Sequence, residues 1–207
     1  MIVARFTAEI LGAVPVAELT VRSRVVRPGR SVELVEAAAA ANGRDVIRAT
    51  AWRVLRTTSE SVPAVQPEPP AVPSGGGPLI GHGWVDGYLS AIEWRMTLGA
   101  FGEPGPATAW TRMCYPLVAD EEPSPLERVL IVADSGNGLS GELDISSWYF
   151  INPELTVHLH REAVCDWIQV DAKTTISAGG AGLATTTLSD QQGPIGNGAQ
   201  SLLVRAR

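Results

Sequence analysis

Apolar and polar residues alternate near both ends of the chain, and this pattern predicts antiparallel sheet at each end. The run Phe6–Leu11 alternates, and so does the run Leu155–His160. Because successive side chains of a strand point to opposite faces of a sheet, this period of two predicts half-buried strands. A second strand is predicted after each run, over Glu18–Val26 and over Trp167–Ile176.

The two ends are predicted to be copies of one four-strand unit, Ala4–Arg56 and Pro153–Arg205. The first strands start 149 residues apart, and the glycines of the last predicted turns, Asn42-Gly43 and Gln192-Gly193, are 150 apart. A repeated unit made of strands implies two copies of one small sheet. Any difference between the copies then indicates where function is concentrated.

A helix is predicted over Pro125–Asp134, between the two copies. Ser124 precedes it as an N-cap, proline occupies the first helical position, and Glu127 completes a capping box. Gly136 and Gly138 follow, where a helix is expected to stop. Apolar residues recur at helical spacing at Leu126, Val129, Leu130 and Ala133.

The middle of the chain predicts a linker followed by more strand. Residues 58–83 hold six prolines and three consecutive glycines, which is typical of an extended tether. Strands are predicted again over Tyr88–Leu98 and Ala107–Leu117. We therefore predict a first repeat over 1–57 and a second over 84–207.

Composition narrows the possible partners. The 207 residues are 45% hydrophobic and 18% charged, with a net charge of −6 and a pI near 5.1. An acidic chain argues against nucleic acid, which needs clustered Lys and Arg. No apolar run is long enough to span a bilayer, and no signal peptide is evident. Cys114 and Cys165 have no metal or disulfide spacing, so we expect two buried, reduced thiols and a cytoplasmic protein.

One helix wrapped by a curved antiparallel sheet is the hotdog architecture, and two copies make a double hotdog. Family-like features appear in order at Trp110–Leu117, Ser124–Gly138, Asn152–Arg161 and Asp190–Arg205, and at Arg27–Arg30 and Phe150–Pro153. In these segments the chain resembles type II acyl-CoA thioesterases, and especially their actinobacterial thioesterase-like branch. The resemblance implies an α+β double hotdog that hydrolyses a fatty or other acyl-CoA to free acid and CoA, without a cofactor or metal.

The same resemblance implies three site residues. In the family a carboxylate at the end of the hotdog helix, a hydroxyl or amide, and a glutamine of the last strand hold and polarise the attacking water. The matching residues here are Asp134, Asn152 and Gln200. Asn152 departs from the threonine of the best-known relatives, but an amide can still orient a water. We expect the three side chains to converge at a pocket mouth.

The residues themselves add chemical support. Asp134 is predicted at a helix C-terminus, where the macrodipole disfavours a carboxylate by about 0.3–1 kcal/mol. A raised pKa suits a general base. The amides of Asn152 and Gln200 offer N–H groups that could orient water or hold an oxyanion. The competing interpretations are a solvated turn residue, a turn before Pro153 and an ordinary strand residue.

The repeat offset places Val3 opposite Asn152 and Thr50 opposite Gln200, with nothing opposite Asp134. The first copy is therefore predicted to lack its central helix, and the site is predicted in the second copy. Both side-chain rows of Val46–Leu55 are largely apolar, so we expect a bare sheet face and a homo-oligomer. An upstream strand and helix before Met1 would also cover that face.

Other patterns carry less weight. Gly136–Gly141 matches the GxGxxG dinucleotide pattern, but it follows a helix and is expected to be a loop. His158 and His160 share a strand face without a third metal ligand. Two other functions stay open: a non-catalytic hotdog that binds acyl-CoA or acyl chains, and a structural fragment that works only within an oligomer.

Overall fold

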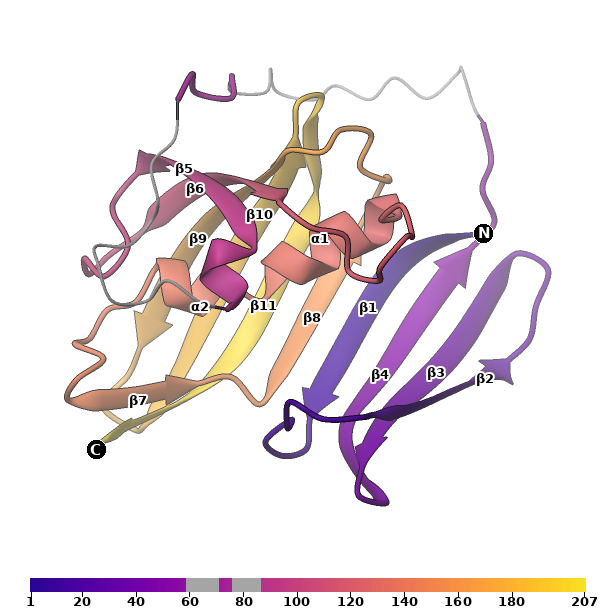
Figure 1. The fold of residues 1–207 in the computed structure, drawn as a ribbon, viewed down its shortest axis with the longest axis horizontal. Coiled ribbons are helices and arrows are strands. Elements are labelled where there is room, and N and C mark those ends of the chain that lie inside the picture. Colours follow the sequence, from indigo (N-terminus) through magenta and orange to yellow (C-terminus); the bar gives the residue numbers. More distant parts are fainter. Residues whose placement is uncertain (59–70, 76–86) are drawn as a thin grey trace.

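The computed structural model describes residues 1–58, 71–75 and 87–207. Within them, one antiparallel sheet runs the length of the molecule (Figure 1). Its strands are β1 (Ile2–Ile10), β2 (Thr20–Arg27), β3 (Val32–Ala41), β4 (Arg44–Val54), β5 (Ile92–Leu98), β6 (Ala107–Met113), β7 (Trp148–Ile151), β8 (Glu154–Leu159), β9 (Ile168–Ile176), β10 (Ala181–Asp190) and β11 (Gly193–Ala206). Their order is β2-β3-β4-β1-β8-β11-β10-β9-β6-β5, and β7 pairs with β11 beside this path.

The predicted repeat is visible in the strand order and in the register. Strands β1–β4 and β8–β11 are arranged alike, and the copies meet where β1 pairs with β8. At that junction Thr7 pairs with Thr156, the equivalent residue 149 positions later. Adding 149 to the residue numbers of each β3–β4 pair gives a β10–β11 pair, and the two hairpins have a bulge at the equivalent position. A local two-fold axis through the Thr7–Thr156 pair therefore relates the two copies.

The predicted turn of the second hairpin was placed one residue too late. The turn is Gln191-Gln192, and Gly193 is already the first residue of β11, with φ 113°. Asp190 closes the turn by accepting the backbone N–H of Gln192 at 2.8 Å. A carboxylate thus supplies the turn signal that the sequence analysis attributed to glycine.

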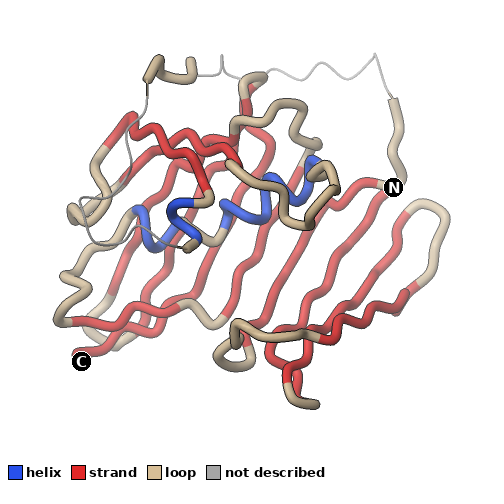
Figure 2. Tube along the Cα trace, viewed as in Figure 1, coloured by secondary structure: helices blue, strands red, loops and turns tan. Residues whose placement is uncertain are grey.

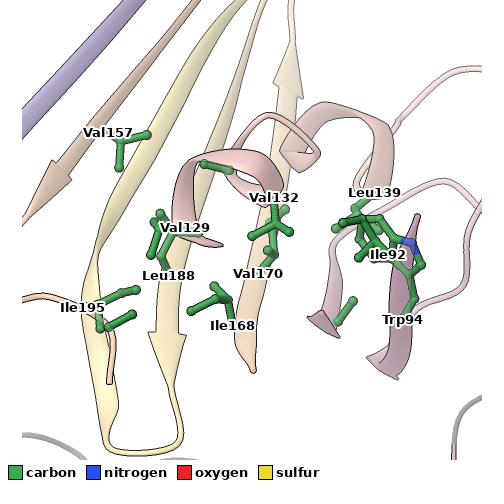
Figure 3. Close-up of a cluster of buried hydrophobic side chains, with 14 of the residues drawn as sticks. Ile92, Trp94, Val129, Val132, Leu139, Val157, Ile168, Val170, Leu188 and Ile195 are labelled. Atoms are coloured by element: carbon green, nitrogen blue, oxygen red, sulfur yellow. The ribbon is translucent and has the colours of Figure 1, made fainter. Parts of the chain in front are cut away.

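The predicted helix is present as α1 (Pro125–Ala133), and its capping box is complete. The backbone N–H of Glu127 donates to Ser124 Oγ, and the N–H of Ser124 donates to the Glu127 carboxylate at 2.6 Å. Val129 and Val132 of α1 are almost fully buried against the sheet of the second copy (Figure 3). Burying one such side chain contributes about 1.5–3 kcal/mol. The core that α1 covers includes Val157, Ile168, Val170, Leu188 and Ile195.

Several local expectations were wrong. Residues Tyr88–Ser90 form a 3₁₀ helix, η1, and the strand begins only at Ile92. A four-residue helix, α2 (Gly136–Leu139), follows α1 where the sequence predicted only loop. Cys114 is exposed and Cys165 half-buried, although both thiols were expected to be buried. Most of the predicted 58–83 linker lies outside the described residues, so the proposed division at 57 and 84 stays a prediction.

The first copy has no helix of its own within residues 1–58, as predicted (Figure 2). Only one of its faces is largely apolar, with the Glu33–Arg53 ion pair at one end, whereas the sequence suggested two. The opposite face carries exposed ion pairs, Arg22–Asp45 and Arg24–Glu36, and Arg27 stacked on Trp52 at 5.8 Å. Charged residues of β2, β3 and the start of β4 therefore make this face polar. The pattern of Val46–Leu55 alone had predicted an apolar face.

An ion pair ties the hairpin turn of the second copy to the end of β8. The Arg161 guanidinium donates two hydrogen bonds, of 2.8 and 2.6 Å, to the buried carboxylate of Asp190. Burial alone would raise the pKa of Asp190, but Arg161 and the backbone N–H groups of Val164 and Gln192 bring it below its ordinary value. Removing one partner of such a pair leaves an uncompensated charge, so this bond fixes the turn firmly.

Candidate active site

The end of α1 positions the first predicted site residue. Asp134 is the C-cap, with helical φ −73° and ψ −9°, directly after the fully buried Ala133. The packing of Ala133 fixes where the next side chain emerges. The negative end of the helix dipole lies at the carboxylate and disfavours its charge.

The structure brings all three predicted residues together at this helix end. Asn152 Nδ2 donates to Asp134 Oδ1 at 2.7 Å, and Gln200 Nε2 donates to the same oxygen at 2.9 Å. A carboxylate can only accept, so both amides must turn their NH₂ groups toward it. Among the described residues, none donates to Asp134 Oδ2. The described residues therefore leave that oxygen available to an incoming water.

Gln200 is fully buried, and its amide is held at both ends. Its Oε1 accepts the backbone N–H of Asn137 at 3.0 Å. Its Nε2 donates to Asp134 twice, to the backbone carbonyl at 3.0 Å and to Oδ1 at 2.9 Å. Both N–H bonds are therefore committed to Asp134. The expected direct role of Gln200 in orienting water does not fit this arrangement, and its contacts fit the positioning of the carboxylate.

A glycine makes room for this amide. A Cβ on Gly136 would lie 2.7 Å from Thr186 Oγ1 and 3.0 Å from Gln200 Oε1. Cβ contacts under 3.0 Å do not occur without a shift of one partner. The glycine-rich stretch that resembled a dinucleotide motif is thus the backbone cradle of the Gln200 amide.

Asn152 approaches Asp134 from the link between β7 and β8. Its second N–H reaches the carbonyl of Glu154 at 3.4 Å, which is a weak bond. The Glu154 side chain is engaged elsewhere, because it accepts the N–H of Ser201 at 2.7 Å and the hydroxyl of Thr156 at 3.1 Å. Glu154 therefore ties β8 to β11 beside Gln200.

The surroundings make Asp134 a better base than an ordinary aspartate. Partial burial raises the pKa of its carboxyl, and the hydrogen bonds from Asn152 and Gln200 lower it by less, so the pKa remains above its usual value. Asp134 nevertheless remains an exposed residue as a whole. This combination of a raised pKa and an open oxygen is typical of a general base.

Beside Asp134 lies a pocket of about 330 Å³ with mostly apolar walls. Tyr88 forms one wall, and its hydroxyl donates to the carbonyl of Ile131 at 2.8 Å. Since that bond uses the only hydroxyl proton, Ser135 Oγ is the donor in its 2.6 Å contact with Tyr88. Partial burial and the Asp134 charge raise the pKa of Tyr88 to about 12, although the Ser135 hydrogen bond lowers it, so the hydroxyl stays neutral. A larger pocket, about 490 Å³, lies away from the three residues, beside Arg112 and Arg128.

Comparison with known protein families shows which family the chain belongs to. A sequence model described as the acyl-CoA thioesterase C-terminal domain matches residues 59–204, and one described as the acyl-CoA thioesterase N-terminal domain matches residues 2–54. The chain belongs to the acyl-CoA thioesterase family. It is a thioester hydrolase, as the resemblance of its sequence motifs predicted.

Solved structures agree with the fold of this thioesterase. The acyl-CoA thioesterase II TesB2 of Mycobacterium marinum matches with a TM-score of 0.70 and 16% identity, over 99% of this chain and 81% of that one. The tesB protein of Mycobacterium avium subs paratuberculosis matches with 0.72 and 16%, over 98% and 78%. A hot dog protein from Alicyclobacillus acidocaldarius matches with 0.73 and 17%, over 99% and 79%. These structural matches confirm the double-hotdog fold. No curated protein sequence matches significantly.

The register of the repeat corrects one correspondence within the thioesterase. A uniform shift of 149 places Ala51, not Thr50, opposite Gln200, while Val3 still corresponds to Asn152. Both equivalents in the first copy are apolar. The first copy thus has neither amide of the Asp134 cluster at the equivalent positions.

Some site residues escaped the sequence analysis. Tyr88 was assigned to a strand, and Gly136 and Asn137 were assigned to a loop without function. Nothing in the spacing of Tyr88 signals its contact with a helix more than forty positions away. The glycine pair at 136 and 138 was a usable signal, because a glycine directly after a buried helix end often permits close backbone approach.

The described residues contain neither a metal-binding cluster nor a membrane-spanning helix. Within residues 1–58, 71–75 and 87–207, no cluster of three His, Cys, Asp or Glu side chains is placed to hold a metal ion. In the same ranges, no helix has both the length and the apolar character needed to cross a membrane.

Proposed function

We propose that this thioesterase hydrolyses acyl-CoA to free acid and CoA, with water activated by Asp134. One observation carries the proposal. The Asp134 carboxylate stands at an apolar pocket with one oxygen held by two amides and the other open. Its raised pKa adds basicity where a water would sit. Loss of CoA thiol release on removal of this carboxylate tests the assignment.

The proposed reaction needs no cofactor. Asp134 Oδ2 takes a proton from water as the water oxygen bonds to the thioester carbonyl carbon. The tetrahedral intermediate collapses, the carbon–sulfur bond breaks, and the electron pair leaves with sulfur. The proton on Asp134 then passes to the sulfur, which yields CoA and the acid. Asn152 and Gln200 hold the carboxylate in place throughout, and Asn152 Oδ1 can accept the second hydrogen of the water.

Asn152 is expected to set the pH dependence of this reaction. In Asn152→Ala the carboxylate loses an N–H donor, so the pKa of Asp134 rises further. A higher pKa leaves less carboxylate at a given pH, so the acid limb of kcat/KM moves to higher pH. Losing a bond to a charged group costs roughly 1.5–3 kcal/mol, so kcat/KM on the acid side of the profile should fall at least about tenfold, while the plateau at higher pH changes less.

Asn152→Thr is the matched control, because the threonine hydroxyl can replace the lost donor. Its pH profile, measured with the same acyl-CoA, should stay close to that of the unchanged chain. An acid limb that does not move in Asn152→Ala would show that Asn152 does not support the carboxylate.

The sequence left open a non-catalytic hotdog that binds acyl-CoA, and membership of the thioesterase family argues against it. The asparagine in place of the family's threonine favours it, because Asn152 supplies no hydroxyl. Binding of acyl-CoA by the full chain without release of CoA thiol would favour this reading over hydrolysis. Hydrolysis that depends on Asp134 excludes it.

We also propose a cytoplasmic homo-oligomer that acts in fatty acid metabolism. Support for self-association comes from the face of β1–β4 that continues the core face of β8, where apolar side chains such as Phe6 and Ala37 are only half-buried. An uncovered apolar face of this kind favours association. Sedimentation of the 207-residue chain should give a dimer or larger species, and a stable monomer would contradict the proposal.

A further inference from the structure

Three aromatic residues form part of the wall of the pocket beside Asp134. Tyr88, Trp94 and Phe101 line it together with Leu89, Ile131 and Leu139. Apart from the cluster at the helix end, the described lining is apolar. A pocket with a reactive carboxylate at one end and hydrocarbon elsewhere suits an acyl group whose carbonyl lies at the carboxylate.

These walls are held in place before any ligand binds. The Tyr88 hydroxyl is tied to the end of α1 by its bonds to Ile131 and Ser135. The indole N–H of Trp94 donates to the carbonyl of Leu89 at 3.1 Å, which fixes η1 against β5. The Tyr88 and Trp94 rings meet edge to face with centroids 6.2 Å apart. A wall with this many fixed contacts does not retreat readily to admit a longer chain.

The size of the pocket then limits the ligand. An apolar cavity of roughly 150 Å³ accommodates one benzene molecule, which has six carbons. At about 330 Å³, this pocket is slightly more than twice as large. It therefore has room for about a dozen acyl carbons at that density.

We propose that this pocket holds the acyl group and selects acyl groups of up to about 12 carbons without a distal charge. The proposal rests on the proposed thioesterase function and names its substrate class. Phe101, on the loop between β5 and β6, is the residue that we assign to the chain-length limit. Trp94 is nearly fully buried and also holds η1, so its replacement would disturb the fold as well.

The test measures kcat/KM for straight-chain acyl-CoAs from butanoyl to hexadecanoyl, with adipoyl-CoA as the charged probe. Each added methylene should raise kcat/KM roughly fourfold until the pocket is full, near 12 carbons, after which the gain should stop. Adipoyl-CoA should be a poorer substrate than hexanoyl-CoA. The chain length at which the gain stops is the break. Phe101→Ala should move the break to longer chains, and Phe101→Trp should move it to shorter ones.

Leu98→Ala is the matched control, because Leu98 is exposed on the same hairpin and does not line the pocket. Its break should stay where it is in the unchanged chain. Binding of S-alkyl-CoA thioethers, which cannot be hydrolysed, gives a second readout independent of turnover. Affinity for these compounds should show the same break and the same shift in the Phe101 variants.

The outcomes separate the two proposals. A steady rise through hexadecanoyl-CoA in both turnover and thioether affinity overturns the pocket assignment and leaves hydrolysis intact. A break that is present but unaffected by both Phe101 variants overturns the role of Phe101. No turnover with any thioester, together with a break in thioether affinity near 12 carbons, removes the hydrolase function and supports the pocket.

Discussion

Replacing Asp134 with Asn is expected to lower kcat for acyl-CoA hydrolysis by at least about 10²-fold, the usual contribution of a general base. The substitution keeps the shape of the side chain and leaves an oxygen to accept the N–H groups of Asn152 and Gln200. It removes only the ability to take a proton. The midpoint temperature of thermal unfolding should be unchanged or slightly higher at neutral pH, since the raised pKa of Asp134 means that the fold disfavours its charge.

Asp120→Asn provides the matched control for this measurement. Asp120 is exposed, lies at the other pocket beside Arg112, and has a positive φ of 64° that asparagine tolerates. Its kcat should equal that of the unchanged chain. Equal activity in Asp134→Asn would remove this carboxylate from the mechanism.

Gly136→Ala is expected to reduce kcat by roughly 10–10²-fold, although it adds only one methyl group. The new Cβ would meet Thr186 Oγ1 at 2.7 Å and Gln200 Oε1 at 3.0 Å, so the Gln200 amide must shift. That shift weakens its bond to Asp134 Oδ1, and the pKa of Asp134 then rises. The acid limb of kcat should therefore move to higher pH, an effect that a merely destabilised fold would not produce.

Gly138→Ala is the natural control, because a Cβ there meets nothing within 4 Å and both glycines belong to α2. Gly138 lines the acyl pocket, so the control is read in kcat and not in KM. Its kcat and the pH profile of kcat should match those of the unchanged chain. Similar losses in both variants would mean that α2 is merely sensitive to substitution. No loss in Gly136→Ala would show that Gln200 tolerates displacement.

Much of the fold could be predicted because its signals are local. The capping box at Ser124 fixes where α1 begins, and strand alternation shows both copies of the repeat. The turn at Gln191-Gln192 could not be predicted by this route, since its geometry depends on the Asp190 carboxylate, which Arg161 holds from the end of β8. That contact joins residues far apart in the sequence.

The candidate site was predictable in its members but not in its bonding. The order of the family-like segments pointed to Asp134, Asn152 and Gln200. It did not reveal that both N–H groups of Gln200 are used on Asp134, because that depends on the backbone N–H of Asn137 reaching its oxygen. Tyr88 was missed for a similar reason, since its contact with the end of α1 is a tertiary one.

The central claim is that Asp134 activates water and does not itself attack the thioester. A single turnover of octanoyl-CoA with excess thioesterase in H₂¹⁸O tests it most directly, with mass spectrometry of both the acid and the Asp134 peptide. The account predicts one ¹⁸O atom in the octanoic acid and none in the Asp134 carboxylate. Unlabelled acid with ¹⁸O in Asp134 would contradict it, because that result requires an acyl-enzyme anhydride.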